Sequence, residues 1–365
     1  MKRVGIGIIG CGNISGAYLK AMRDLPILDV RGLADANPTA AEARAAEFGL
    51  TAVPVEALLA DPSVEIILNL TIPKAHVAVG LQALDAGKHV YSEKPLGIAF
   101  AEGKTLADTA KAKGLRIGAA PDTFLGGAHQ TARALIDEGA IGRPVGGTAF
   151  FMCPGHERWH PAPAFYYEVG GGPMLDMGPY YITDLVNLLG PVARVAGVAT
   201  TPRSTRTITS EPKKGEVIPV HVPTHVAGTL EFVSGAAVTI AMSFDVPAHR
   251  HLPLEIYGTE GALIVPDPNH FGGTIEHLPK GGEWSAVETR YPYADANWRS
   301  IGIAEMAQAI RDGRPHRANG DLALHVLEVM EAFGTSSETG RHIEITTRPD
   351  RPAPLAESLV EGKIA

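Results

Sequence analysis

The segment from Gly10 to Ser15 has the residue types and the spacing of a dinucleotide-binding turn. It reads Gly-Cys-Gly-Asn-Ile-Ser, after an apolar run from Val4 to Ile9 and before residues at helical spacing. Gly10 permits a tight turn, and Gly12 lets the backbone approach a pyrophosphate held at the helix N-terminus. The strand, the turn and the helix together make this pattern more specific than its glycines alone. The predicted cofactor contacts of the turn are Gly10, Gly12, Asn13 and Ile14.

A carboxylate follows the second apolar run, Leu28 to Ala34. Asp35 lies about 20 residues beyond the turn, where a carboxylate commonly binds the adenosine ribose hydroxyls. Because a carboxylate there repels a 2′-phosphate, Asp35 favours NAD over NADP as the cofactor. The alternative is that Asp35 only caps the helix that begins near Pro38, although Asn37 is better placed for that role.

The segment from His156 to His160 matches the zinc-protease pattern H-E-x-x-H. That chemistry needs both histidines on one face of a helix. A Pro-Gly pair precedes the pattern and two prolines follow it within three residues. The sequence therefore predicts a loop at this position and no metal site.

Apolar runs alternate with helical segments over the first third of the chain, which predicts a parallel sheet with right-handed crossovers, a Rossmann domain. The predicted strands are Val4 to Ile9, Leu28 to Ala34, Ile66 to Leu70, Lys88 to Tyr91 and Leu115 to Ala119. The predicted helices include Ala75 to Ala86 and Ala101 to Lys113. A boundary near Pro121-Asp122 divides the chain into a cofactor domain, residues 1–122, and a substrate-binding and oligomerisation domain, residues 123–365.

The second part of the chain is richer in strands than in long helices, which predicts an α+β domain. The strands are Gly147 to Met152, Val192 to Thr200, His225 to Phe232, Ala236 to Phe244 and Leu254 to Tyr257. The helices are Ile301 to Ile310 and Leu322 to Phe333. The segment from Ser204 to Pro223 is predicted to be a loop, with an arm onto a neighbouring subunit as a further interpretation.

The composition narrows the class of protein. The 365 residues are 45% apolar and suit two globular domains, and the formal net charge of −8 argues against a broad nucleic-acid-binding surface. Cys11 and Cys153 are too few for a disulfide framework and favour a reducing compartment. No run approaches the roughly 18 apolar residues of a transmembrane helix, and the run before Cys11 is too short for a signal peptide. We expect a soluble, cytoplasmic protein with no nucleic-acid or membrane partner.

Several further motifs occur in one order along the chain. They are Thr71 to His76 with its P-x-x-H, Gly87 to Val90 (G-K-H-V), Glu93 to Pro95 (E-K-P), Gly139 to Gly142, Gly170 to Gly178 and Tyr257 to Gly261. Together with the glycine turn they resemble the Gfo/Idh/MocA family of oxidoreductases over nearly the whole chain.

The resemblance implies a nicotinamide cofactor on the Rossmann domain and a mostly antiparallel open sheet with helices on one face. It places the active site between the domains and implies a homodimer or homotetramer, whose interface is often the other face of that sheet. It adds cofactor contacts at Thr71, Pro73, His76, Glu93 and Lys94.

Lys94 lies just past a predicted strand, where the nicotinamide ring would lie, and the resemblance implies that its ammonium binds the reacting oxygen. Where many family members have a catalytic histidine in a D-x-x-x-H pattern, this chain has Tyr180, four residues after Asp176. Tyrosine in this position resembles the branch with glucose–fructose oxidoreductase and dihydrodiol dehydrogenase. We expect Tyr180 to be the acid/base and Asp176 to orient the substrate or Lys94, with core packing and helix capping as their alternatives.

Helix geometry adds a condition. Pro179 is acceptable only in a first turn, so we expect Asp176 to precede the regular helix and Tyr180 to open it. Asp184, one turn further, is expected to be structural.

The pocket loop completes the predicted site. We expect Trp159 to stack on a sugar face and His156, Arg158 and His160 to donate hydrogen bonds to the substrate, with a solvated loop as the alternative. The leading hypothesis is an NAD-dependent dehydrogenase that oxidises a hydroxyl of a sugar, glycoside or cyclitol. The alternatives are a cofactor-recycling sugar oxidoreductase, an NAD-dependent glycoside-cleaving enzyme, and a non-catalytic sensor of a metabolite or nucleotide.

Overall fold

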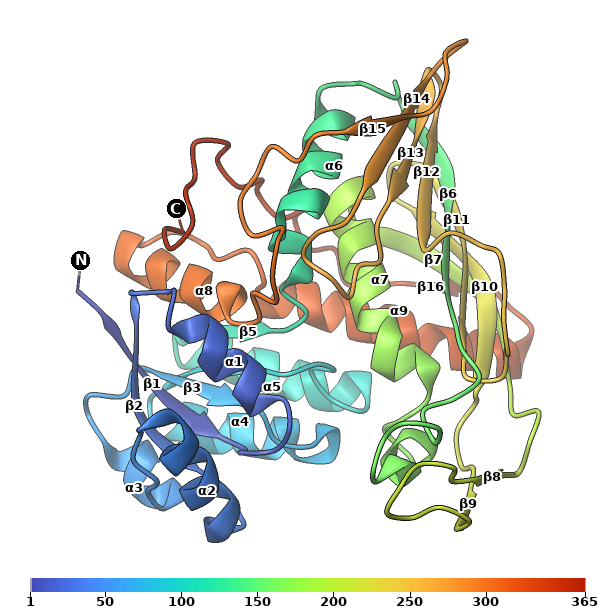
Figure 1. Ribbon diagram of the computed structural model, residues 1–365. Helices are drawn as coiled ribbons and strands as arrows, with labels where there is room; N and C mark the ends of the chain where they lie inside the picture. Colours follow the sequence, from blue (N-terminus) through green and yellow to red (C-terminus); the bar gives the residue numbers. More distant parts are fainter. Residues whose placement is uncertain (1, 365) are drawn as a thin grey trace.

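The computed structural model describes residues 2–364 and contains two large sheets (Figure 1). The first is a five-stranded parallel sheet in the order β2-β1-β3-β4-β5. Its strands are β1 (Val4–Ile9), β2 (Leu28–Ala34), β3 (Ile66–Asn69), β4 (His89–Ser92) and β5 (Ile117–Ala119). The predicted Rossmann sheet is confirmed, and the first two strands have the predicted bounds.

Helices connect the strands of this sheet. They are α1 (Ser15–Met22), α2 (Pro38–Phe48), α3 (Val55–Ala60), α4 (His76–Asp85) and α5 (Phe100–Ala112). Every residue of β1 and of β3 is buried, as expected for parallel strands that are covered on both faces. The carboxyl ends of β1, β3 and β4 therefore open at one edge of the sheet, where the glycine turn, the Thr71 loop and Lys94 follow.

The second sheet has nine strands in the order β15-β14-β13-β12-β6-β11-β10-β7-β16. Its strands are β6 (Pro144–Met152), β7 (Val192–Thr200), β10 (His225–Phe232), β11 (Ala237–Ser243), β12 (Leu254–Gly258), β13 (Gly261–Val265), β14 (Ile275–Pro279), β15 (Ser285–Val287) and β16 (Ile343–Glu344). All neighbours are antiparallel except β6 and β11, which run parallel. The mostly antiparallel open sheet that the family resemblance implied is confirmed.

Helices pack against one face of this sheet (Figure 1). They are α6 (Gly127–Asp137), α7 (Pro173–Leu189) and α9 (Gly320–Thr339). Strand β11 alternates accordingly, since Val238 and Ile240 are buried while Ala237 and Thr239 are exposed. Helix α8 (Ile301–Asp312) instead packs beside β5, so the late part of the chain returns to the first sheet.

Two local expectations are wrong. The segment from Ser204 to Pro223 is not only a loop, because β8 (Thr205–Thr207) and β9 (Val217–Pro219) pair as a small antiparallel sheet. Ion pairs of Arg206, described below, hold this hairpin against the body of the protein. Within residues 2–364, no helix has both the length and the apolar character needed to cross a membrane.

The second wrong expectation concerns α7. The helix begins at Pro173 and continues through Pro179, so Asp176 does not precede it and Tyr180 does not open it. Proline lacks one donor and disturbs the preceding turn. Every residue from Met177 to Leu189 is nevertheless buried, and this packing outweighs the local cost. Asp176, Tyr180 and Asp184 consequently lie at i, i+4 and i+8 on a single helix.

Candidate active site

The glycine turn leaves an open surface where a dinucleotide phosphate would bind. Gly10 has a φ of +107°, and an added Cβ would lie 2.4 Å from the Leu70 carbonyl carbon, so only glycine fits there. An added Cβ at Gly12 would meet nothing within 4 Å. The hydroxyl of Ser15 donates to the Gly12 carbonyl (2.7 Å) and closes the turn. These residues fit a pyrophosphate at the N-terminus of α1.

Asp35 stabilises this turn directly. Its two carboxylate oxygens accept the backbone N–H groups of Cys11 (2.7 Å) and Asn37 (2.8 Å), yet the residue stays part-exposed and keeps lone pairs for a ligand. Asn37 caps α2 through Thr39 N (3.2 Å), which confirms it as the cap. Burial, with Asp35 nearby, raises the pKa of the Cys11 thiol to about 11, so Cys11 is a packing residue.

Buried hydrogen bonds hold the loop after β3. The Asn69 side chain donates to the His76 carbonyl (2.9 Å) and accepts from the Thr71 hydroxyl (2.6 Å). The ring nitrogens of His76 lie 2.7 Å from the Pro95 carbonyl and 2.9 Å from the Thr71 carbonyl. Burial lowers the pKa of His76, so the neutral ring donates to one of these carbonyls at a time. His76 is fully buried and joins the Thr71 loop to the Lys94 loop, as a support for the loop that begins η1 (Pro73–Ala75).

Lys94 joins the end of β4 to helix α7. Its ammonium donates to the Asp176 carboxylate (2.7 Å) and to the Asp176 main-chain carbonyl (2.6 Å). Burial would lower the pKa of Lys94, but Asp176, Tyr180 and Glu93 raise it, so the group stays charged. An ammonium has three donors, and two are used here. One N–H of Lys94 therefore remains for a ligand.

Glu93 holds the Lys94 loop in place through two hydrogen bonds. Its carboxylate accepts the Tyr18 hydroxyl (2.7 Å) from α1 and the Lys94 backbone N–H (2.9 Å). Glu93 is almost fully buried, so these two contacts fix the loop relative to the glycine turn.

The structure brings His156 to Asp176. The His156 Nε2 atom lies 3.1 Å from the second Asp176 carboxylate oxygen, and Trp159 Nε1 lies 3.1 Å from His156 Nδ1. An indole N–H only donates, so Nδ1 is the acceptor and Nε2 carries the proton given to Asp176. Burial would raise the pKa of Asp176, but Lys94 and His156 lower it to about 2. Both nitrogens of His156 are therefore engaged within the protein, where the sequence analysis expected a contact with substrate.

The other predicted substrate contacts of this loop, Arg158, Trp159 and His160, do not share one common partner. The segment from His156 to His160 is not helical, which confirms the predicted loop. Trp159 is 56% exposed, whereas Arg158 contacts the carbonyl of Gly155 (3.4 Å) and His160 accepts from Ala162 N (3.0 Å). Across residues 2–364, no three His, Cys, Asp or Glu side chains come together in a way that could hold a metal ion.

Tyr180 lies beside two cations. The Lys94 ammonium is 5.1 Å from the centre of the Tyr180 ring, and the Arg299 guanidinium carbon is 5.9 Å from it. Burial raises the pKa of Tyr180, and Lys94 and Arg299 offset part of that rise. Arg299 could not be predicted from the sequence, because it lies outside every motif, 119 residues from Tyr180.

Asp184 lies at the far end of the same helix face. Its carboxylate accepts from His129 Nδ1 (2.8 Å), and His129 Nε2 lies 2.8 Å from the His270 carbonyl. Burial would lower the pKa of His129, but Asp184 raises it above its ordinary value. The buried pair of His129 and Asp184 joins α6, α7 and the segment after β13, which supports the expectation that Asp184 is structural.

A second buried cluster supports the pocket loop. Arg206 on β8 pairs with Glu157 (3.0 Å) and with Asp245, and its guanidinium lies over the Tyr167 ring at 5.3 Å. The Tyr167 hydroxyl also donates to Glu157. Arg206 and both carboxylates are less than 10% exposed. The glutamate of the H-E-x-x-H pattern is therefore occupied by an ion pair within the fold.

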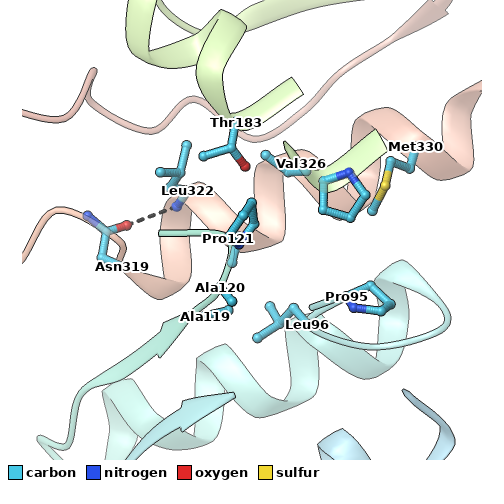
Figure 2. A pocket seen from close by; sticks show the side chains of 12 residues that line it. Pro95, Leu96, Ala119, Ala120, Pro121, Thr183, Asn319, Leu322, Val326 and Met330 are labelled. Atoms are coloured by element: carbon cyan, nitrogen blue, oxygen red, sulfur yellow. Dashed lines mark hydrogen bonds between the residues drawn. The ribbon is translucent and has the colours of Figure 1, made fainter. Parts of the chain in front are cut away.

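A small cavity lies beside the Pro95 loop, between the end of β5 and helices α7 and α9 (Figure 2). Its volume is about 10 Å³, and side chains from the Pro95 loop, the end of β5, α7 and α9 line it. This space suits about one water molecule and is too small for a nucleotide or a sugar. A nucleotide or a sugar therefore cannot bind inside this cavity.

Comparisons with known proteins match both parts of the chain. A model of the NAD-binding Rossmann fold of the GFO/IDH/MocA oxidoreductases matches residues 4–120, and a model of the family's C-terminal domain matches residues 129–264.

Individual relatives agree with this match. The 1,5-anhydro-D-fructose reductase of Ensifer adhaerens is 26% identical over 313 residues, covering 82% of this chain and 85% of the relative. The levoglucosan dehydrogenase of Pseudarthrobacter phenanthrenivorans is 26% identical over 294 residues, covering 72% and 74%. A solved levoglucosan dehydrogenase in complex with NADH superposes with a TM-score of 0.84 at 21% identity, over 95% of this chain and 100% of that chain. The chain therefore belongs to the Gfo/Idh/MocA family of oxidoreductases.

Proposed function

We propose that this oxidoreductase is an NAD-dependent dehydrogenase that oxidises a hydroxyl of a sugar, glycoside or cyclitol. The observation that carries the proposal is that the Lys94 ammonium donates two of its three N–H groups to Asp176. The remaining donor lies at the carboxyl end of β4, on the same sheet edge as the glycine turn. This geometry suits polarisation of an alcohol or carbonyl oxygen beside a bound nicotinamide.

Lys94 and Tyr180 then divide the proton chemistry. When bound, NAD supplies the hydride acceptor. Lys94 hydrogen-bonds the reacting oxygen while the phenolate form of Tyr180, a minor fraction at neutral pH because burial raises the pKa of the phenol, accepts its proton. The C–H bond breaks with both electrons leaving as hydride. In the reverse direction the neutral phenol returns the proton. Because the pKa of Asp176 is about 2, its carboxylate stays charged and keeps Lys94 an ammonium throughout.

The preference for NAD rests on Asp35. Its carboxylate is part-exposed at the end of β2, beside the glycine turn. The remaining lone pairs suit ribose hydroxyls, and the negative charge opposes a 2′-phosphate.

The substrate class rests on the pocket loop. Trp159 and Phe165 expose 56% and 45% of their surfaces, and Tyr166 packs between His156 and Phe165. Exposed rings beside hydrogen-bonding groups suit a ligand with apolar ring faces and many hydroxyls. Relatives named for 1,5-anhydro-D-fructose and levoglucosan support a carbohydrate.

Two further features belong to the same proposal. We place the division between the cofactor domain and the substrate domain at residues 122 and 123. We also expect a homodimer or homotetramer formed through the face of the nine-stranded sheet that carries exposed Thr239 and Val198.

The test mixes the purified protein with NAD or NADP and a panel of pyranoses, alkyl and aryl glycosides, and inositols, and follows reduced nicotinamide by absorbance. Rapid reduction of NAD with one class supports the proposal. No reduction with any member, in protein shown to bind NAD, contradicts it. Nucleotide that copurifies with the protein and is reduced without release would instead indicate a recycling reaction.

A further inference from the structure

Hydrogen bonds of the neighbouring residues fix the backbone at Arg299. Arg299 lies two residues before α8, and the N-cap residue between them, Ser300, has a φ of 121°, which is unusual for a residue with a side chain. The buried Asp122 carboxylate accepts the backbone N–H groups of Ser300 (3.1 Å) and Gly302 (2.9 Å). The Ser300 hydroxyl donates to the Tyr18 carbonyl (3.1 Å). These contacts join the backbone that follows Arg299 to α1 and to the segment after β5.

The guanidinium of Arg299 is held by amides rather than by an acid. It donates to the side-chain oxygens of Asn269 (2.8 Å) and Asn297 (3.1 Å), and one nitrogen lies 3.4 Å from the Tyr180 hydroxyl oxygen. Among residues 2–364, no carboxylate comes within ion-pair distance of it. Amide oxygens orient a guanidinium but do not neutralise its charge.

This distinguishes the two cations beside Tyr180. Lys94 is paired with Asp176, so much of its charge is compensated. Arg299 makes no direct ion pair within residues 2–364, and its charge is compensated only at longer range, by the carboxylates of Glu93 and Asp122. The other titratable groups that face Tyr180 are Glu93 at the end of β4, which opposes the cations, and Tyr166 from the pocket loop.

We propose that Arg299 is a positioning residue for Tyr180, orienting the phenol through its hydroxyl oxygen and stabilising the phenolate that accepts the substrate proton. The inference rests on the proposed function, because it gives Tyr180 that proton. The step is balanced: the proton leaves the substrate hydroxyl for the phenolate, and the carbon that bears this hydroxyl loses a hydride, which a bound oxidised nicotinamide would accept.

The proposal predicts an effect that depends on direction. Alcohol oxidation needs the ionised phenol, which Arg299 stabilises, whereas carbonyl reduction uses the neutral phenol. Arg299→Gln should therefore slow oxidation at neutral pH by about tenfold or more, and the oxidation rate should recover as the pH rises. The reason is that a charge at this distance shifts the pKa of a neighbouring group by roughly 1–3 units. Reduction should slow less. Arg299→Lys keeps the charge and should restore part of the oxidation rate.

The test titrates the phenol itself and needs no substrate. Tyr180 is replaced by 3-fluorotyrosine, whose phenol is more acidic, and its ionisation is followed by fluorine NMR in the otherwise unaltered chain. Adding Arg299→Gln should raise the midpoint by roughly 1–3 pH units, and adding Arg299→Lys should raise it less. Arg290→Gln, which removes a surface arginine paired with Glu138, is the matched control and should not move the midpoint.

An unchanged midpoint in Arg299→Gln overturns the inference, and weaker NAD binding in the same variant would assign Arg299 to the cofactor instead. The proposed function fails differently: Tyr180→Phe would keep full oxidation with its pH profile intact. Folding is checked by circular dichroism, and Asn269→Asp gives a second route to the same answer. That variant keeps Arg299 but neutralises it, so the phenol midpoint should rise as well.

Discussion

Two buried clusters of cations and carboxylates flank the pocket loop, and they differ in one respect. Arg206 is 2% exposed and binds Glu157, Asp245, the Phe244 carbonyl and the face of Tyr167. Lys94 is 15% exposed and uses only two of its three donors. The first cluster is closed to any ligand, because even its one unpartnered donor, Arg206 Nε, is buried. The second cluster keeps one donor of Lys94 free.

The difference separates structure from chemistry. A buried charge whose partners are all within the protein stabilises one arrangement of the chain. A buried charge with a free donor in a cleft has its orientation fixed in advance, and a ligand can use it without reorganisation. Arg206 therefore belongs to the support of the pocket loop, and Lys94 to the proposed reaction.

The largest expected effect tests the open cluster. Lys94→Ala should lower kcat by about 10²–10⁴, because it removes the donor to the reacting oxygen. NAD affinity should stay largely unchanged, as measured by calorimetry beside steady-state kinetics. Lys104→Ala, an exposed lysine paired with Asp108, is the matched control and should change neither quantity. Near-normal turnover of Lys94→Ala would remove the distinction between the two clusters.

The closed cluster predicts the opposite outcome. Arg206→Met should lower the free energy of unfolding by about 3–5 kcal/mol, because it leaves Glu157 and Asp245 buried without their cation. Denaturant unfolding measures this loss. The pH midpoint of the remaining activity should not move, since Arg206 contacts neither Lys94 nor Tyr180. Arg290→Met, at an exposed ion pair, should cost no more than about 1 kcal/mol, and an equal loss from both variants would contradict the assignment.

His129 adds a third case to the comparison. Both of its ring nitrogens have partners within the protein, yet its charge depends on pH. Its pKa is raised in the folded protein, so its stabilisation is fully present below the unfolded pKa of about 6.5 and is lost as pH rises through the folded pKa. His129→Gln should therefore be less stable than the parent near pH 6, with the gap narrowing at alkaline pH. Each tenfold change in proton affinity corresponds to about 1.4 kcal/mol. A gap between the two unfolding curves that does not change with pH would show that His129 is neutral.

Asp35 shares a feature with each of the two clusters, because its carboxylate binds the glycine turn and is also part-exposed. Asp35→Ser should reduce the preference for NAD over NADP by about fivefold, the effect of removing roughly 1 kcal/mol of charge repulsion in water. The ratio of kcat/KM for the two cofactors measures it. Asp29→Ser, at a part-exposed position on the same strand that pairs with Arg31, is the control. An unchanged ratio would restrict Asp35 to its support of the turn.

The sequence predicted the cofactor half closely because its signals are local. Apolar runs, glycines and caps lie within a few residues of the elements they define, as the bounds of β1 and the Asn37 cap show. The closeness of Lys94, Asp176 and Tyr180 could be expected only through the family resemblance, because residues 94 and 176 are 82 positions apart.

The remaining features depend on contacts that no local pattern encodes. Helix α7 passes through Pro179 because of its burial, which a single-residue rule does not include. Arg299 meets Asn269 and Tyr180 from 30 and 119 residues away, and the Arg206 cluster joins positions separated by 39 to 49 residues. Asp122, placed at the predicted boundary between the domains, is also the acceptor that fixes the start of α8.

The position of β6 in its sheet also has a consequence for how the molecule assembles. Its neighbours are β11 and β12, which begin at residues 237 and 254, whereas β6 ends at residue 152. Such non-local pairing raises contact order and slows folding. During synthesis, α7 and its catalytic candidates must leave the ribosome before the sheet beneath them can close. The cofactor half can form early, but the proposed proton-transfer groups acquire their geometry only when the last third of the chain has arrived.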